Sequence, residues 1–295
     1  MTEDDIQQLR REKWHAGSPL STLEEARDFV ASVGLCLLYP MQPAVLLPTF
    51  LGAWLGADHN VPGARQAFAE PRARQAEQIV DQLAAGREVF LSNLLADNVV
   101  LVSPTVFPYF CALACDKTPA TGQPLSRMAQ QALAAMVEPS PITAEPLRTH
   151  LGAELSTAAI ERALIELWTH MRVLPVGRDA QGARLWQVTE RWAPDALREA
   201  QQISMPAAIS GLVSQYLEAV VAADPVQVEE LFGHLAPRSK IKDAVNAMLG
   251  AREFSLLNIG HHSLVQVTPE RIPHQERQDA RPRRGATKPD KQQEA

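Results

Sequence analysis

A short basic segment near the C-terminus, "PRSKIKDAVNAML", carries side chains of the types that contact nucleic acids. Ile241 and Val245 have the spacing of the buried side of a helix, so the cationic and amide side chains around them face outward. Lysine and arginine neutralise phosphates, and residues at the start of such a helix reach base edges. The competing interpretation is a solvated face with a capping serine, which Asp243 beside Lys242 favours. The predicted DNA contacts of this helix are Arg238, Ser239, Lys240, Lys242 and Asn246.

A second group of arginines lies in the segment "IERALIELWTHMRVLPVGRDAQGARLWQV". Its first half has the apolar stripe of a helix, and its second half has the pattern of a hairpin with Arg178 and Arg184 at the rims of the loop. Arginines placed there can straddle a DNA backbone or a minor groove, and Arg162 is the cation of the helix. Glu161 and Glu166 on that helix would repel phosphates, so a solubilised loop tip is the competing interpretation.

Signatures of catalysis or metal binding are missing from the sequence. It contains no P-loop, G-x-G-x-x-G, H-E-x-x-H or G-x-S-x-G motif. His261 and His262 are neighbours in a predicted hairpin, so they point to opposite faces and do not easily bind one ion. Cys111 and Cys115 lie one helical turn apart without further ligands at zinc spacing, and with Cys36 they are predicted to be buried free thiols. The sequence therefore predicts no cofactor and no metal.

Three stretches of the chain share one order of elements, helices followed by a two-stranded hairpin. In the first stretch, Ser21 and Glu24 form a predicted capping box at the start of a helix. The apolar, proline-punctuated segment from Leu35 to Gly56 is predicted to form buried short helices. After a further helix, the dipeptide Asp97-Asn98 marks the turn of the hairpin.

The second and third stretches repeat this order. In the second, Ser156 or Thr157 caps the last helix before the hairpin. In the third, Asp224 caps a short helix with Pro225 at its first position, and the last hairpin turns near Gly260. The predicted fold class is therefore α+β, mostly helical, with three tandem winged-helix domains.

The boundaries of the predicted domains follow from these elements. The C-terminal residues are too polar and too rich in proline to bury a core, which predicts disorder. The predicted parts are residues 1–20, a polar N-terminal arm; 21–122, a first winged-helix-like domain; 123–200, a second winged-helix domain; 201–270, a third winged-helix domain; and 271–295, a disordered basic tail.

Composition and charge limit the class of protein. The apolar runs are short and broken by proline, so no stretch reaches the roughly 18 residues of a membrane helix, and the polar N-terminus has no signal core. The net charge is −6, and because the basic tail contributes +3, the remainder carries −9. An acidic body lowers the expectation of nucleic-acid binding, although local patches decide it. We expect a cytoplasmic protein.

Three segments carry a resemblance to a known family. They are "LEEARDFVASVGLCLLYPMQ", "VVLVSPTVFPYF" and "ALIELWTHMRVLPVGRDAQGARLWQVTERWAP", the last ending in a W-x-P turn at Trp192-Ala193-Pro194. Together they resemble the winged-helix DNA glycosylases of the AlkZ family, which unhook crosslinks and excise alkylated bases, and AlkZ-related proteins still more. The resemblance covers most of Ser21 to Pro269. It implies tandem winged helices, DNA as the partner and a link to DNA damage.

The sequence departs from the family where catalysis is expected. The glycosylases carry a Gln-x-Gln or Gln-x-Asp pair after the first helix, and here the matching stretch is the apolar "CLLYP", with Leu37 and Leu38. The nearest glutamine is Gln42, and "FLSNLL" lacks the histidine that the family carries before its first wing. Base excision requires a group that activates water or stabilises the developing positive charge. The resemblance therefore predicts that the catalytic motif is lost.

These observations predict a protein that binds duplex DNA through phosphate contacts, led by the third domain and helped by the basic tail. The first alternative is an AlkZ-type glycosylase. Its cleft would be lined by Tyr39, Gln42 and Tyr109, with Arg238 and Lys240 on the DNA backbone. The second alternative is a module that docks a protein partner, which the acidic body favours. Phosphate binding predicts steep salt dependence, whereas protein docking predicts no DNA affinity and an exposed apolar patch.

Overall fold

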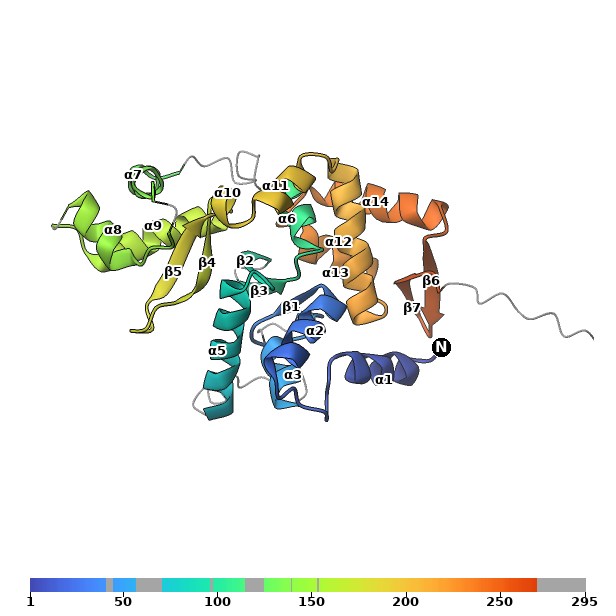
Figure 1. Ribbon diagram of the computed structural model, residues 1–295. Coiled ribbons are helices and arrows are strands. Elements are labelled where there is room, and N and C mark those ends of the chain that lie inside the picture. The colour runs from blue at the N-terminus through green and yellow to red at the C-terminus, as the bar shows by residue number, and fades with distance from the viewer. Residues whose placement is uncertain are drawn as a thin grey trace, which may run out of the picture.

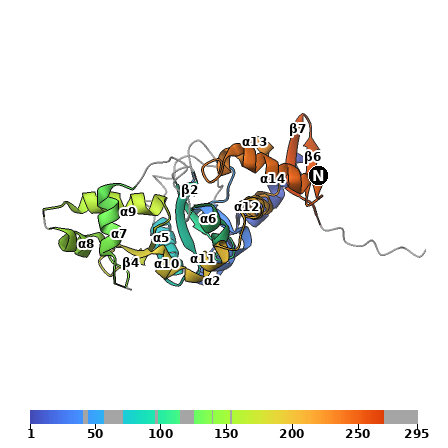
Figure 2. The same ribbon diagram turned by 90° about the horizontal axis from the view of Figure 1, so that it is seen from above.

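The computed structural model is an elongated, mostly helical α+β arrangement with small antiparallel hairpins (Figures 1 and 2). Three groups of elements, called here the first, second and third units in chain order, build it. The second unit lies at one end, the first in the centre and the third at the other end. The described residues are 1–40, 45–56, 71–95, 98–114, 125–138, 140–152 and 154–269.

The first unit packs helices around a three-stranded antiparallel sheet. Its elements are α2 (Leu23–Val33), β1 (Leu35–Leu37), α3 (Phe50–Leu55), α5 (Pro71–Ala85), β2 (Phe90–Leu95) and β3 (Asn98–Val102). The strand order is β1–β3–β2. The prediction of a short helix at the start of the segment Leu35 to Gly56 was wrong, because Leu35–Leu37 pairs residue by residue with the buried end of β3.

The second unit has helices, a short bridge and a two-stranded hairpin. Its elements are α7 (Arg127–Ala135), α8 (Ala144–Leu151), α9 (Thr157–Thr169), β4 (Val173–Arg178) and β5 (Arg184–Val188). Ser156 caps α9 through its side chain, as one of the two predicted residues. Between α7 and α8, Ile142 forms an antiparallel bridge to Trp186 of β5, which ties the first helix to the hairpin.

The third unit repeats this plan. Its elements are α12 (Met205–Val220), α13 (Pro225–Phe232), α14 (Arg238–Gly250), β6 (Phe254–Ile259) and β7 (His262–Val267). The predicted cap of α13 is confirmed, with Asp224 at the N-cap and Pro225 in the first turn. Ala223 forms an antiparallel bridge to Val265 between α12 and α13, at the position that Ile142 holds in the second unit.

Connecting helices join the three units into one body. They are α6 (Phe107–Ala114), α10 (Thr189–Trp192) and α11 (Pro194–Ala200). Helix α6 packs against both α11 and α12, and α12 also contacts α2 and β1. A Cβ at Gly211 of α12 would lie 2.8 Å from the ring of Tyr109, so only glycine permits this close approach. The buried apolar side chains of all three units form one continuous cluster.

The expected polar arm is a helix that caps the third unit. Helix α1 (Glu3–Lys13) packs against α12, whose last carbonyl groups have no partner within the helix. The Arg10 guanidinium donates to the carbonyls of Val220 and Ala222, at 2.8 and 2.6 Å, and burial lowers the pKa of this guanidinium. The Trp14 indole donates to the carbonyl of Ala219 at 2.9 Å. These long-range contacts explain why the charged segment is ordered.

Two local predictions need adjustment. The capping box of α2 is formed by Thr22 and Glu25, one residue later than predicted, because the Thr22 hydroxyl accepts from the Glu25 amide. The hairpin predicted around Asp97-Asn98 is present as β2 and β3, although Asp97 itself lies outside the described residues. Among the described helices, none has the length and apolar character needed to cross a membrane.

Candidate nucleic-acid interface

The outer face of α14 presents the predicted cationic and amide side chains to solvent. Ile241, Ala244 and Val245 are buried and fix the rotation of the helix. This rotation follows from helical periodicity, since the buried residues recur three and four positions apart. The exposed residues on the opposite side are Arg238, Ser239, Lys240, Lys242 and Asn246. All five predicted residues of this helix are therefore exposed to solvent.

The cations of α14 are weakly engaged within the protein. Lys240 lies 3.8 Å from Asp243, with 59 and 69% of the two side chains exposed, and such pairs hold together only loosely. In the described part of the chain, Arg238 and Lys242 form no ion pair. The positive charge of this helix is therefore available to an anionic partner.

A protruding hairpin follows α14. Strands β6 and β7 pair without a break from Phe254–Val267 to Ile259–His262, as Figure 1 shows at the end of the third unit. Gly260 makes the turn with a φ of +58°, a backbone conformation that glycine adopts without strain. His261 and His262 are exposed at this tip. Groups of three or more side chains suited to hold a metal do not occur in the described residues.

Arg178, at the rim of the second unit's hairpin, is held by the first unit. Its Nε lies 2.9 Å from Oδ2 of Asp81 on α5, and its Nη1 donates to the Gly182 carbonyl at 3.0 Å. Burial raises the pKa of the Asp81 carboxyl, and the Arg178 charge opposes this shift. The predicted loop arginine is thus an ion-pair partner across two units.

Arg184 is half-buried beside the same helix. Its guanidinium carbon lies 6.0 Å from the ring centre of Trp168 and 5.8 Å from that of Trp186. Burial lowers the pKa of this guanidinium, and the charges of Asp81 and Glu77 act against that shift. We call the group of Tyr39, Glu77, Asp81, Arg178 and Arg184 the junction cluster.

The close approach of the hairpin to α5 depends on a glycine. Gly177 has a φ of +117°, and a Cβ there would lie 3.2 Å from the Asp81 carbonyl oxygen. The register between β4 and β5 shifts between Pro175 and Arg178, which marks a bulge at this point. The bulge directs the rim of the hairpin toward α5.

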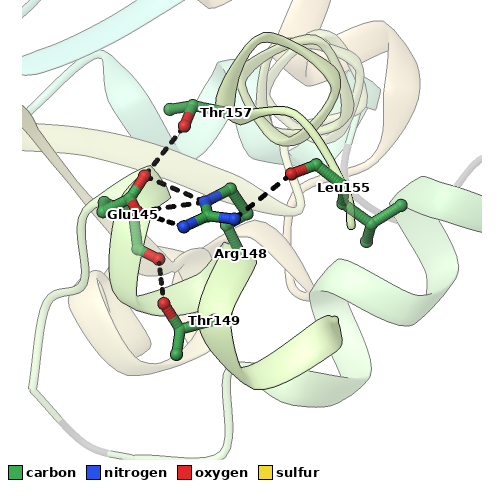
Figure 3. A network of polar contacts seen from close by, with 5 residues as sticks. All are labelled: Glu145, Arg148, Thr149, Leu155 and Thr157. Atoms are coloured by element: carbon green, nitrogen blue, oxygen red, sulfur yellow. Dashed lines mark hydrogen bonds and ion pairs between the residues drawn. The ribbon is translucent and has the colours of Figure 1, made fainter. Parts of the chain in front are cut away.

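The other charged residues of the second unit are used locally. Figure 3 shows the Arg148 guanidinium between the Glu145 carboxylate, 2.6 Å away, and the Leu155 carbonyl, while Thr157 donates to Glu145 at 2.8 Å. These bonds lower the pKa of Glu145 to about 2 and fasten α8 to the start of α9. Glu166, which was expected to repel phosphates, is only partly exposed.

Glu166 instead fastens the start of α7. Its carboxylate accepts from the amide and the hydroxyl of Ser126, both at 2.6 Å, because Ser126 precedes the first turn of that helix. Arg162 remains exposed on α9, where its Nε donates to the Ala158 carbonyl at 3.3 Å. Arg162 is therefore exposed and, unlike Arg178, forms no ion pair in the described residues.

The stretch "CLLYP" is part of the core. Cys36, Leu37 and Leu38 are each less than a tenth exposed, and burial raises the pKa of the Cys36 thiol. The Tyr39 hydroxyl donates a hydrogen bond to the Glu77 carboxylate. Burial raises the pKa of this hydroxyl, and the hydrogen bond to Glu77 acts in the same direction.

The residues of the predicted glycosylase cleft have separate surroundings. Tyr39 lies in the junction cluster, whereas Tyr109 on α6 packs against α12. Gln42 lies outside the described residues. Cys36 and Cys111 are buried as predicted, and Cys115 lies outside the described residues.

A cavity of about 430 Å³ lies elsewhere, where α6 meets α10 and α11. Its described lining includes Cys111, Leu197 and Ile203 together with Arg172 and Arg198. The Arg198 guanidinium is paired with Asp195. None of the predicted contact residues lines this cavity in the described part of the chain.

Comparison with known proteins gives this arrangement a family. The model of a family named AlkZ-like, and described as "DNA glycosylase AlkZ-like", matches residues 51–285, well over half of the chain. The chain belongs to the AlkZ-like DNA glycosylase family. Membership places it in the context of DNA repair and implies DNA as the partner. No curated protein matches the sequence.

The fold of this family member also has a solved counterpart. It is similar to Streptomyces sahachiroi DNA glycosylase AlkZ, with a TM-score of 0.59 and 12% sequence identity. The likeness covers 91% of this chain and 70% of that chain. At this identity the similarity establishes a shared fold.

The acidic partners of the hairpin arginines cannot be recognised from the sequence. Asp81 and Arg178 are 97 positions apart, and no local pattern connects them. A row of glutamines on α5, Gln75, Gln78 and Gln82, was likewise not singled out, although its spacing of three and four is visible in the sequence.

Proposed function

We propose that this AlkZ-like protein binds duplex DNA and that the third unit leads the contact. One observation carries the proposal: the cations of α14 are exposed and have weak or no internal pairing in the described part of the chain. Lys240 and Lys242 neutralise phosphates, while Asn246 is placed to face the groove. Arg238 and Ser239 stand at the start of the helix, the part of a recognition helix that reaches bases.

The same proposal assigns the three units to winged helices, with the boundaries predicted from the sequence. Its support is the element order, in which a strand or bridge separates the first two helices and pairs with the hairpin. In the first unit β1 does this, and Ile142 and Ala223 do it in the other two. Arg162 adds an exposed cation in the second unit, whereas Arg178 and Arg184 position its hairpin.

We propose that the protein binds DNA without excising bases, and the surroundings of the "CLLYP" stretch support this. A glycosylase needs a polar group that activates water near the extruded base. Here the corresponding side chains are buried in the core, and Tyr39 is hydrogen-bonded to Glu77. Excision of alkylated or crosslinked bases is the second candidate function, because the family is one of DNA glycosylases.

Fluorescence anisotropy of a short labelled duplex tests the binding proposal. Residues 1–270 and the full chain are compared at about 50 and 200 mM salt, where several phosphate contacts predict a loss of affinity of many fold. Binding and salt dependence in both proteins support the proposal. Binding by the full chain alone would assign the DNA contact to residues 271–295. No binding by either would favour protein docking.

A separate assay addresses the second candidate. Duplexes carrying an alkylated base or an interstrand crosslink are incubated with the protein and then treated with alkali, which cleaves abasic sites. We expect no abasic product. Product formation that survives the substitution Tyr39→Phe would place the excision chemistry elsewhere, and product formation in the wild type alone would assign it to the junction cluster.

A further inference from the structure

The hairpin of the first unit is covered by the second unit. The Trp168 indole on α9 donates to the Leu91 carbonyl of β2 at 2.9 Å, and Asn93 donates to the Thr169 hydroxyl at 2.9 Å. Ser92 of β2 is fully buried beneath Met171. Strand β2 of the first hairpin is therefore covered by residues of the second unit.

The hairpin of the second unit lies beside α5 instead. Gly177 allows β4 to approach the α5 backbone, and Arg178 pairs with Asp81 about one turn before the helix ends. Figure 1 shows β4 and β5 next to the upper part of α5. Helix α5 is the last helix before the hairpin in its unit, as α14 is in the third unit. The β4–β5 hairpin of the second unit therefore lies beside α5, the last helix before the hairpin of the first unit.

The outer face of α5 carries three neutral amides. Ala76, Val80 and Leu83 are buried on its inner side, whereas Gln75, Gln78 and Gln82 are exposed. Their spacing of three and four residues aligns them along one face. Hydrogen bonds from these side chains are not found within the described part of the chain.

The charges next to this face are balanced. Glu77 accepts a hydrogen bond from the Tyr39 hydroxyl, and Asp81 pairs with Arg178, while Arg184 lies half-buried among them. The two carboxylates of α5 that would repel phosphates are therefore matched by two guanidinium groups. Among the described residues, neither α5 nor the β4–β5 hairpin has a large apolar side chain that is exposed. Balanced charge and exposed amides fit a nucleic-acid groove better than an apolar protein surface.

We propose that α5 and the β4–β5 hairpin form a composite surface, built from two units, that contacts the grooves of duplex DNA. Gln75, Gln78 and Gln82 face the base edges, where a glutamine side chain can bond two atoms of adenine. The exposed Gln181 in the loop of the β4–β5 hairpin lies along the adjacent DNA backbone in this arrangement. This inference rests on the proposed DNA binding and adds a second contact surface, distinct from α14, that reads bases rather than phosphates.

The test substitutes two amides and compares affinity with salt dependence. The variant Gln78→Ala/Gln82→Ala is titrated against a short mixed-sequence duplex at several salt concentrations. Its matched control is Gln131→Ala/Gln202→Ala, which removes two exposed glutamines from α7 and from the segment after α11. We expect the first variant to bind about fivefold or more weakly, because the hydrogen bonds of two amides to base edges are lost. The control should stay within about twofold.

The dependence on salt separates this surface from α14. Neutral amides release no counterions, so the slope of affinity against salt should be unchanged in Gln78→Ala/Gln82→Ala. In Lys240→Ala/Lys242→Ala the slope should fall by about 2. Weaker binding in the lysine variant with no change in the glutamine variant would overturn the composite surface and leave the proposed function intact. No binding by the wild type would overturn both.

Discussion

The second and third units share an order of elements but use their cations in opposite ways. In the second unit, Arg148 bonds Glu145 and Arg178 bonds Asp81. In the third unit, Lys240 has a loose partner in Asp243, and Lys242 has no ion pair in the described residues. The same order of elements can therefore have cations that form internal ion pairs or cations that stay exposed, depending on what packs beside them.

The neighbours of each unit account for this difference. The hairpin of the second unit lies against α5, where Asp81 and Glu77 face it. The third unit is joined to the rest of the protein through α12, which leaves the outer face of α14 uncovered. Position in the whole protein therefore decides what a basic residue does.

The largest expected effect comes from reversing charge on α14. Lys240→Glu/Lys242→Glu should weaken duplex binding by about tenfold to a hundredfold and reduce the salt slope by about 2, because two phosphate contacts are lost. Arg11→Glu/Arg127→Glu makes the same change of charge at exposed sites on α1 and α7. Equal losses in both variants, measured by anisotropy, would mean that overall charge rather than α14 governs binding.

A smaller effect is expected at the hairpin that is docked on α5. Gly177→Ala should lower the free energy of unfolding by about 3 kcal/mol, since the new Cβ meets the Asp81 carbonyl in a strained backbone. Gly182→Ala in the same hairpin has open space around it and should cost about 1 kcal/mol. Urea unfolding measures both. Equal costs would show that the approach to α5 is not tight.

The ion pair across the first and second units should be modest in energy. A double-mutant cycle of Asp81→Asn and Arg178→Gln is expected to give a coupling of about 0.2–1 kcal/mol, because both side chains keep contact with solvent. Arg178→Gln should leave the salt slope of DNA binding unchanged, whereas Lys242→Gln should lower it by about 1. A lower slope in both variants would remove the distinction between the two units.

The smallest effect concerns acid stability in the second unit. The Arg148 and Thr157 bonds hold the pKa of Glu145 at about 2, below its ordinary value of 4.5. The carboxylate therefore contributes stability above about pH 4.5, and this contribution is lost as the pH falls through about 2. The urea midpoint of Glu145→Gln should lie below that of the wild type at pH 6 and approach it at pH 2.

An exposed neighbour provides the control for this measurement. Glu161 on α9 has no ion pair or side-chain hydrogen bond in the described residues, so Glu161→Gln should follow the wild type at each pH. A constant difference between Glu145→Gln and the wild type from pH 6 to pH 2 would contradict the role of the network in Figure 3.

Local patterns were enough to predict several elements and one face of the candidate site. The cap at Asp224 was predicted, and Ser156 was one of two residues predicted to cap α9, because a capping side chain bonds an amide two or three residues away. The outward face of α14 followed from the spacing of Ile241 and Val245. Such predictions succeed when the interacting groups are neighbours in the chain.

Other features depended on distant partners and escaped prediction. The strand at Leu35–Leu37 forms because it pairs with β3, more than 60 positions away. Helix α1 is ordered because Arg10 bonds carbonyls 210 and 212 positions away. Glu166, expected to face phosphates, caps α7 through Ser126.

Most of the helices, the hairpins and the exposed cations of α14 followed from the sequence, since helical and strand periodicity are local properties of the chain. Which arginines have internal partners depends on the folded arrangement. Arg178 and Arg184 look as accessible as Lys240 and Lys242 in the sequence, yet α5 brings two carboxylates beside them. The physical reason is that an ion pair depends on distance in space, and the folded chain sets that distance.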